Sequence, residues 1–236
     1  MSSILDAALA NPWSTLEAML DGPLHPGGTD ATADLLARAD VGPESRVLDV
    51  GCGAGEALSV ARDRGADAVG IDPSPGADRA IRGDATALPI RDSSVDVLLA
   101  ECVLCLTDLP TALGEARRVL VDGGRLAVSD VVVDGDADGP PVPDRVAEAL
   151  CLSGARSRDR LRSAVEAAGF EVRTVTDHHD DLLTTRDRVA DRVDYEGLLG
   201  LLGQRGRRAL DAIETLETAV ENREVGYVSV VADATR

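Results

Sequence analysis

The stretch that decides the fold is VLDVGCGAG, residues 47–55. It begins as a short apolar run typical of a buried strand, and a helical pattern follows at residues 55–64. Between them, Gly51 and Gly53 permit positive φ angles and let the backbone approach a ligand closely. The helix N-terminus offers free N–H groups to a carboxylate or a pyrophosphate. Strand, glycine turn and helix together favour a ligand site, although a tight turn without a ligand has the same pattern.

Apolar strand-like runs alternate with helical patterns along the chain, which is the signature of a parallel sheet with crossover helices. Strands are predicted at residues 46–50, 68–72, 95–101, 125–133, 170–175 and 225–232. Helices are predicted at residues 3–20, 29–39, 55–64, 109–120, 143–152, 157–168, 180–202 and 205–221. We expect Thr29 to cap the helix that it begins and Gly169 to stop the helix before it. Residues 134–143 are predicted to form an acidic loop.

Composition limits the classes of partner. Of the 236 residues 44% are apolar, enough for a sizeable core, and only 2% are aromatic, which nearly excludes base-stacking platforms. The net charge of −18 would repel nucleic acid and anionic membranes. All 24 cationic residues are Arg, and this acidic, Lys-free composition suggests a halophilic or high-GC source. Because salt screens self-repulsion, we expect low salt to destabilise the fold.

The location of the protein is expected to be cytoplasmic. No apolar run reaches the ~18 residues that a membrane span needs, and the first residues lack the features of a secretion signal. The four cysteines do not form the pattern of a disulfide framework in a chain of this length. The expected partner is a small molecule, with neither nucleic acid nor a membrane, and the oligomeric state cannot be predicted from the sequence.

Three acidic residues follow or end successive strand-like segments. Asp49 lies in the first, Asp72 closes the second, and Asp84 follows a third short apolar segment. In nucleoside-binding α/β folds the acid at the end of the second strand holds the ribose hydroxyls. A third acid can accept from an adenine amine. Because parallel strands end at one edge of a sheet, the three carboxylates are expected to lie along one ligand-binding edge.

The motifs VLDVGCGAG, GID, GDATALP, SVDVLLAE and EARRVLVDGGRLAVSD occur in this order over residues 41–133. In this order they resemble the class I S-adenosylmethionine-dependent methyltransferases. The resemblance implies a Rossmann-like, doubly wound, mostly parallel seven-stranded sheet with an antiparallel last strand. It also implies a methyltransferase domain at residues 41–236 behind a helical lid segment at residues 1–40. The cofactor would be S-adenosylmethionine, and its binding residues would be Asp49, Gly51, Cys52, Gly53, Gly55, Asp72, Pro73, Asp84, Ala85 and Glu101.

The connection between Asp72 and Asp84 departs from this family, which has a whole crossover helix there. Only residues 73–83 separate the two acids. Parallel neighbouring strands need a connection of about a dozen residues or more. The helix after the second strand is therefore expected to be short or absent, and the third strand short, irregular or missing. This makes the assignment of Asp84 weaker than that of Asp72.

The cysteines indicate the acceptor. Cys102 and Cys105 follow the fourth strand, and Cys151 lies in a Cys-x-x-Gly-Ala stretch after the acidic loop. That stretch resembles arsenite methyltransferases, where a Cys in this setting binds trivalent arsenic; Cys151 matches well and Cys102 less securely. Thiolates bind soft centres, so the three thiols are candidate substrate ligands if the loops bring them together. The alternative is that they are small buried hydrophobes.

His25, in LHPGG at residues 24–28, is a candidate base or substrate contact, and a loop-stabilising hydrogen bond is an equal alternative. With Cys151 and Cys102 it completes the candidate catalytic set. Three functions remain open at this point. The leading one is methyl transfer to a small-molecule acceptor, with a thiophilic metalloid such as arsenite as the best single candidate. The others are methylation of an ordinary carbon, oxygen or nitrogen acceptor with structural cysteines, and a cofactor- or metalloid-binding module without catalysis.

Overall fold

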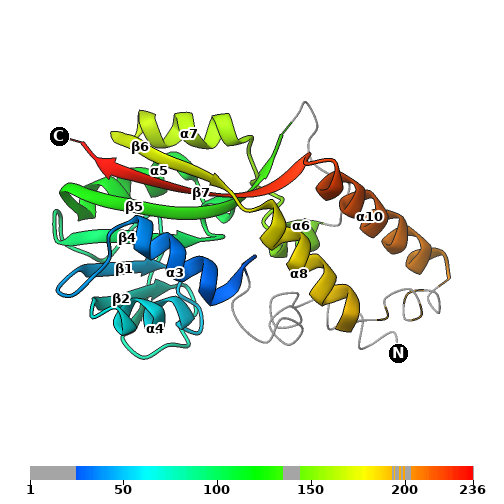
Figure 1. Cartoon of the computed structure of the whole chain (residues 1–236), viewed down its shortest axis with the longest axis horizontal. Coiled ribbons are helices and arrows are strands. Elements are labelled where there is room, and N and C mark those ends of the chain that lie inside the picture. Colours follow the sequence, from blue (N-terminus) through cyan, green and yellow to red (C-terminus); the bar gives the residue numbers. More distant parts are fainter. Residues whose placement is uncertain are drawn as a thin grey trace.

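The sheet of this protein has seven strands in the order β3-β2-β1-β4-β5-β7-β6 (Figure 1). The computed structural model describes residues 25–134, 144–192, 194, 197, 199 and 203–235. The strands are β1 (Arg46–Val50), β2 (Asp67–Asp72), β3 (Ala80–Arg82), β4 (Val95–Glu101), β5 (Leu120–Val133), β6 (Phe170–Asp177) and β7 (Val225–Ala234). The helices are α3 (Gly28–Arg38), α4 (Glu56–Asp63), the 3₁₀ turn η1 (Leu104–Leu106), α5 (Leu109–Val119), α6 (Asp144–Ala149), α7 (Arg158–Ala167), α8 (His179–Arg192) and α10 (Gln204–Glu221).

The pairing of the strands confirms the predicted α/β class. β1 pairs in parallel with β2 and β4, β2 with β3, and β4 with β5. β7 runs antiparallel to both of its neighbours, β5 and β6. The sheet is therefore mostly parallel with an antiparallel last strand, as the resemblance implied.

The short connection between β2 and β3 also has the expected form. Residues 73–79 contain no helix, and β3 has only three residues, Ala80 to Arg82, paired with the end of β2. Ile81 of this edge strand is 48% exposed. The flank of the sheet beside Asp72 is thus covered by a loop where a crossover helix would otherwise lie.

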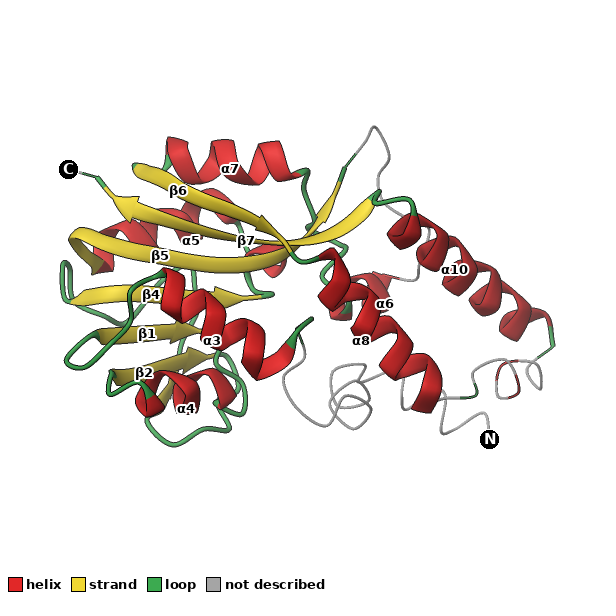
Figure 2. Ribbon diagram, viewed as in Figure 1, coloured by secondary structure: helices red, strands yellow, loops and turns green. Residues whose placement is uncertain are grey.

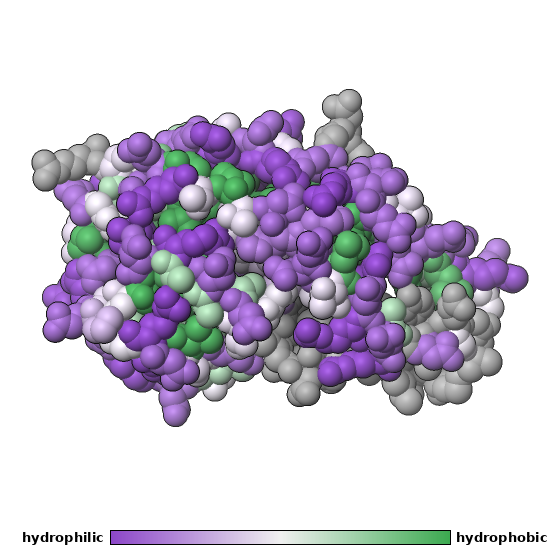
Figure 3. All heavy atoms as spheres, viewed as in Figure 1, coloured by the Kyte–Doolittle hydropathy of each residue, from purple (hydrophilic) through white to green (hydrophobic). Residues whose placement is uncertain are grey.

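Two layers of helices bury the sheet (Figure 2). On one face, α3 and α4 pack on side chains such as Val47 and Leu99. On the other, α5 and α7 pack on Leu48 and Leu98. Neighbouring residues of one strand point to opposite faces, so a stretch covered on both sides is apolar at consecutive positions, as β4 is from Val97 to Ala100. The outer surface is mainly hydrophilic in the view of Figure 3, as the charge predicts.

Several element boundaries differ from the sequence prediction. α3 begins at Gly28 after Gly27, whose φ is 79°, and has no side-chain cap, so the expected cap by Thr29 is wrong. β5 begins at Leu120, earlier than the strand predicted at residues 125–133, because residues 121–124 form a bulge: β4 pairs Val95 with Leu120 but Val97 with Arg125. Gly169 ends α7 with φ 89°, as expected.

Some predicted segments lie outside the described residues: the helix at 3–20, most of the acidic loop at 134–143, and parts of 193–202.

Helices α6, α8 and α10 lie beyond the carboxyl ends of β1 and β4 (Figure 1). Among the described residues, every helix is too short or too polar to traverse a lipid bilayer.

Candidate functional site

The glycine turn after β1 holds its shape through backbone hydrogen bonds and positive φ angles. The φ angles of Gly51, Gly53 and Gly55 are 79°, 46° and 93°. The amide groups of Gly51 and Cys52 both donate to the carbonyl oxygen of Ile71, at 2.7 and 3.2 Å. A side chain at Gly51 would overlap Val103, whereas one at Gly53 would meet no described atom within 4 Å. Gly53 therefore leaves open space directly above the backbone, where a ligand can approach.

Asp72 is fixed at the end of β2 by the same turn. Its Oδ2 accepts a hydrogen bond from the Gly53 amide at 3.0 Å, and its Oδ1 accepts from the Ser74 amide at 2.6 Å. The carboxylate keeps free lone pairs, because each oxygen can accept more than one hydrogen bond. Asp72 and the glycine turn thus form one unit at the carboxyl edge of the sheet.

Asp49 is the most unusual group of this edge. It is 3% exposed, and its Oδ2 has no hydrogen-bond partner among the described residues. Burial raises the pKa of Asp49 well above its usual value, and the nearby carboxylates of Glu101, Asp72 and Glu56 raise it further. A cation that enters this edge would be stabilised by all four groups.

Glu101, the last residue of β4, is held in a buried polar network. Thr32 donates to its Oε2 at 2.8 Å, and Ser129 Oγ lies 3.5 Å from its Oε1. Ser129 in turn accepts from the Tyr227 hydroxyl group at 2.6 Å. Burial raises the pKa of Glu101, and nearby His25 and the bond from Thr32 partly oppose that shift.

His25 belongs to this network. Its Nε2 lies 3.3 Å from Thr32 Oγ1 and 3.5 Å from Glu101 Oε2, and its Nδ1 lies 3.2 Å from the carbonyl oxygen of Pro26. Both ring nitrogens thus face protein atoms, and these contacts favour the alternative that His25 stabilises its loop by hydrogen bonds. A role for His25 as a base stays a prediction.

The other predicted cofactor residues belong to the glycine turn or follow β2 and β3. Asp84 is exposed, and its Oδ1 accepts from the amide and hydroxyl groups of Thr86, which lower the pKa of the Asp84 carboxyl group. Ala85 is partly buried beside it, and Pro73 is exposed directly after β2. The Cys52 side chain packs against Gly70, where no side chain would fit, so only its backbone faces the turn.

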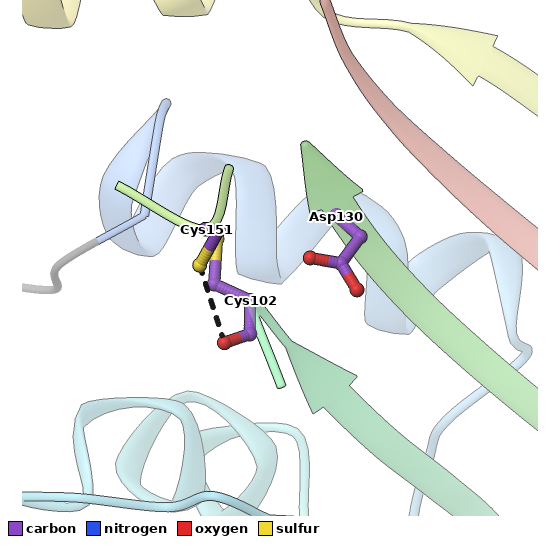
Figure 4. Close-up of side chains that lie close together, drawn as sticks. All are labelled: Cys102, Asp130 and Cys151. Atoms are coloured by element: carbon purple, nitrogen blue, oxygen red, sulfur yellow. Dashed lines mark hydrogen bonds between the residues drawn. The ribbon is translucent and has the colours of Figure 1, made fainter. Parts of the chain in front are cut away.

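Three thiols from two distant segments of the sequence converge beyond β4. Cys102 follows β4, Cys151 follows α6, and Figure 4 shows both beside Asp130 of β5. The Sγ atoms of Cys102 and Cys151 and a carboxylate oxygen of Asp130 all lie within 4.8 Å of one another. Cys151 Sγ also lies 3.5 Å from the carbonyl oxygen of Cys102. These residues and Cys105 are called the thiol cluster below.

Cys105 joins the cluster through backbone packing. Its amide donates to Asp130 Oδ2 at 2.9 Å, and its thiol hydrogen bonds with Cys151. Gly154 packs on its carbonyl group, where no side chain would fit. The Cys-x-x-Gly spacing therefore has a physical reason: the glycine lets the Cys151 turn dock on η1.

Two of the thiols lie on strained backbone. Cys102 has φ 55° and Cys151 has φ 59°, in the left-handed region that residues with a Cβ rarely adopt. Such conformations cost about 1–3 kcal/mol each and cluster at functional sites. In these conformations the two sulfur atoms lie within 4.8 Å of each other.

All three thiols are protonated at neutral pH. Hydrogen bonding with Cys151 and burial raise the pKa of Cys102 well above its usual value. Hydrogen bonding with Cys102 lowers the pKa of Cys151, but its bond with Cys105 and burial raise it more. For Cys105, the bond with Cys151 lowers the pKa. Burial and the nearby Asp130 carboxylate raise it more, so the pKa is about 11. The cluster is thus a neutral thiol site beside one carboxylate.

Asp130 was missed by sequence reasoning. Burial raises its pKa to about 6, although hydrogen bonds from Cys105 and Val131 oppose the shift. The available signal was the polar pair Ser129-Asp130 inside an otherwise apolar strand, since a strand buried on both faces tolerates polar residues only where they have partners.

Comparison with known proteins gives a consistent result. The methyltransferase domain family matches residues 48–128. The chain is 36% identical over 177 residues to methyltransferase GfsG of Streptomyces halstedii, covering 66% of this chain and 63% of that protein. It is 31% identical over 180 residues to an arsenite methyltransferase of Halobacterium salinarum, covering 66% and 45%. It is 31% identical over 153 residues to the O-methyltransferase rstn1 of Aspergillus nomiae, covering 57% and 68%.

The chain thus spans less than two thirds of the length of the first two of these relatives. Among solved structures, the crystal structure of the [4+2]-cyclase SpnF has a TM-score of 0.71 at 22% identity, covering 96% of this chain and 93% of that one. This likeness supports the fold alone, because one fold hosts many reactions.

Proposed function

The chain belongs to the class I S-adenosylmethionine-dependent methyltransferases, and from that membership we propose that it transfers the methyl group of S-adenosylmethionine to a small-molecule acceptor. The relatives include proteins named for arsenite and for oxygen acceptors. The acceptor is therefore argued from the residues of this chain.

The residues of the glycine turn fit the cofactor. S-Adenosylmethionine carries a cationic sulfonium group, an ammonium group and two ribose hydroxyl groups. Asp49 Oδ2, which has no hydrogen-bond partner in the described part of the chain, and the carboxylates around it favour the cationic groups, and the remaining lone pairs of Asp72 suit the hydroxyl groups. The open space above Gly53 admits the ligand to the backbone. Asp84, Ala85 and Pro73 are proposed to contact the adenine side.

When bound, S-adenosylmethionine supplies an electrophilic methyl group attached to a positively charged sulfur atom. The chain has to position a nucleophile in line with it and exclude water. Glu101 ends β4 directly before Cys102, so the cofactor edge and the thiol cluster adjoin along the chain. Thr32 and Ser129 hold the Glu101 carboxylate in place.

We propose a thiophilic metalloid such as arsenite as the acceptor, held by Cys102, Cys105 and Cys151. The observation that carries this proposal is the convergence of these thiols at the end of β4. Trivalent arsenic binds sulfur strongly, and its lone pair can attack a methyl group without a base. The relative from Halobacterium salinarum adds support through its printed name.

The protonated state of the thiols suits a neutral metalloid hydroxide. Each ligand exchange breaks one As–O bond and forms one As–S bond, and the thiol proton leaves with the hydroxide as water. No charge is created in the buried site, and the oxidation state of arsenic does not change. A divalent cation such as Zn²⁺ would instead require ionised thiolates, which burial disfavours here.

The second candidate is methylation of an ordinary oxygen acceptor with structural cysteines. The burial of Cys105 and Cys151, 5% and 3% exposed, favours it, since free cysteines often pack as small hydrophobes. Several relatives carry the name O-methyltransferase. In either case the free thiols are in keeping with a reducing, cytoplasmic location.

The variants Cys102→Ser and Cys151→Ser distinguish the two candidates. The thiol proposal expects both to lose arsenite binding and arsenite methylation while calorimetry shows S-adenosylmethionine binding unchanged. The matched control is Cys52→Ser, which removes a buried thiol outside the cluster and should retain arsenite binding. Unchanged turnover of both cluster variants would exclude a thiol-held acceptor. Absence of S-adenosylmethionine binding at millimolar ligand would exclude methyl transfer itself.

A further inference from the structure

A pocket of about 440 Å³ lies beside the thiol cluster. Residues of η1, of α6 and of the turn after Cys151 line it: Cys105, Leu106, Thr107, Glu148, Ser153 and Gly154. These lining residues include none of the glycine turn and neither Asp49 nor Asp72. Within the described part of the chain, the pocket is thus separate from the edge that we assign to the cofactor.

Cys105 connects the pocket to the cluster. It lines the pocket while only 5% exposed, and its thiol hydrogen bonds with Cys151. Cys151 in turn hydrogen bonds with Cys102, directly after β4. The three sulfur atoms therefore form a series from the pocket toward Glu101.

We propose that this pocket is the entrance for the acceptor and that Cys105 is the first thiol that the acceptor binds. This inference rests on the proposed thiophilic acceptor. A trivalent metalloid hydroxide exchanges one hydroxide for the Cys105 sulfur: one metalloid–oxygen bond breaks, one metalloid–sulfur bond forms, and water leaves. A second exchange with Cys151 releases a second water and draws the metalloid toward Cys102.

The lining of the pocket also favours an uncharged ligand over an anion. Glu148 lies in the wall of the pocket, and the chain has a net charge of −18. An anion would be repelled, whereas an uncharged hydroxide would not. The pocket is therefore suited to neutral trivalent arsenite and unsuited to an anionic pentavalent oxyanion.

The test narrows the pocket without touching a thiol. Ser153 is exposed in the lining, so Ser153→Trp places a large side chain there without disturbing the core. Ser163→Trp on the exposed face of α7 is the matched control. Arsenite is mixed with the full-length reduced protein in a stopped-flow instrument, and the near-ultraviolet absorbance of As–S bonds gives the rate and the final amplitude.

We expect Ser153→Trp to slow arsenite loading at least tenfold while the final amplitude stays that of the wild type. Ser163→Trp should load at the wild-type rate, and Cys105→Ser should load slowly with a reduced amplitude. Wild-type loading rates in both Ser153→Trp and Cys105→Ser would overturn the proposal that this pocket is the entrance. No As–S absorbance in the wild type would instead overturn the thiol-held acceptor, so the two failures are distinguishable.

Discussion

Gly154 packs directly on the backbone carbonyl group of Cys105, so closely that any side chain at position 154 would overlap the carbonyl oxygen. Arg156 reinforces this contact, because its Nη1 donates to the Gly154 carbonyl at 2.8 Å and to that of Leu104 at 3.4 Å. Packing between the backbones of two distant segments therefore brings Cys151 to Cys105.

The variant Gly154→Ala should separate the two thiols. Overpacking typically costs about 1–3 kcal/mol, so we expect a loss of stability in that range by urea unfolding. Arsenite affinity should fall while S-adenosylmethionine affinity is retained. The control is Gly114→Ala in α5, where a Cβ meets no described atom and helix propensity predicts a gain of up to about 1 kcal/mol. Equal stability of the two variants would contradict the packing described.

The variant Thr32→Val should disturb Glu101. It removes a 2.8 Å hydrogen bond from a carboxylate that is 6% exposed, and an unsatisfied buried acceptor costs about 1–3 kcal/mol or more when it is charged. We expect lower stability and weaker S-adenosylmethionine binding by calorimetry. Thr215→Val is the matched control: Thr215 is exposed, and its hydroxyl group donates to the Asp211 carbonyl within α10, so the effect should stay within about 0.5 kcal/mol.

The variant Asp49→Asn should separate stability from binding. The amide removes a buried negative charge from a group of repelling carboxylates, so the melting temperature without ligand should stay or rise. S-Adenosylmethionine affinity should fall at least tenfold, which corresponds to about 1.4 kcal/mol. Exposed Asp63→Asn at the end of α4 should change neither quantity. Unchanged affinity of Asp49→Asn would mean that the cofactor cations bind elsewhere.

Asp130 predicts a pH dependence of stability. Burial raises its pKa from 3.8 to about 6 in the folded state, so the folded protein binds this proton more tightly than the unfolded chain. Protonated Asp130 therefore stabilises the folded state, and this contribution is fully present below about pH 4. As the pH rises toward 6, the free energy of unfolding falls by at most about 1.4 kcal/mol per pH unit from this group. Asp49 and Glu101, whose pKa values are also raised, give a slope of the same sign in both proteins, so urea unfolding between pH 4 and 7 should show a steeper loss of stability in the wild type than in Asp130→Asn. Parallel curves for the two proteins would refute the assignment.

Salt should stabilise the fold, because a net charge of −18 repels itself in dilute buffer. At 1 M salt the Debye length is ~3 Å, so repulsion across the surface is screened. Exposed ion pairs such as Arg79 with Asp67 weaken under the same conditions, but each contributes little. We expect a higher melting temperature in molar potassium chloride than in dilute buffer. Equal melting temperatures would show that repulsion between the acidic residues does not destabilise the fold in dilute buffer.

The sequence predicted those parts of the site that local pattern determines. The glycine turn, Asp49 and Asp72 lie within a single strand–turn–helix–strand unit, where spacing fixes their relation. The missing helix after β2 followed from the length of the connection alone, because residues 73–83 are too few for a whole crossover helix. The roles of these residues and of Asp84 toward a cofactor stay predictions.

The thiol cluster could be suspected from the sequence but not placed. The approach of Cys151 to Cys102 depends on the docking of Gly154 against η1, which is a contact between segments far apart in the chain. The positive φ angles at both cysteines carry no signal in residue type, since such angles usually favour glycine. Asp130 was missed because the polar pair Ser129-Asp130 does not itself show that the carboxylate meets the Cys105 amide, which belongs to another segment.

The place of β7 between β5 and β6 has a consequence for biogenesis. Among the described strands, β6 pairs with β7 alone, and β7 is synthesised after both of its neighbours. While the chain emerges from the ribosome, the valine-rich edge of β5 stays unpaired until residue 234 has been made. A nascent chain released before that point exposes an open, apolar strand edge, and such edges recruit other chains or chaperones.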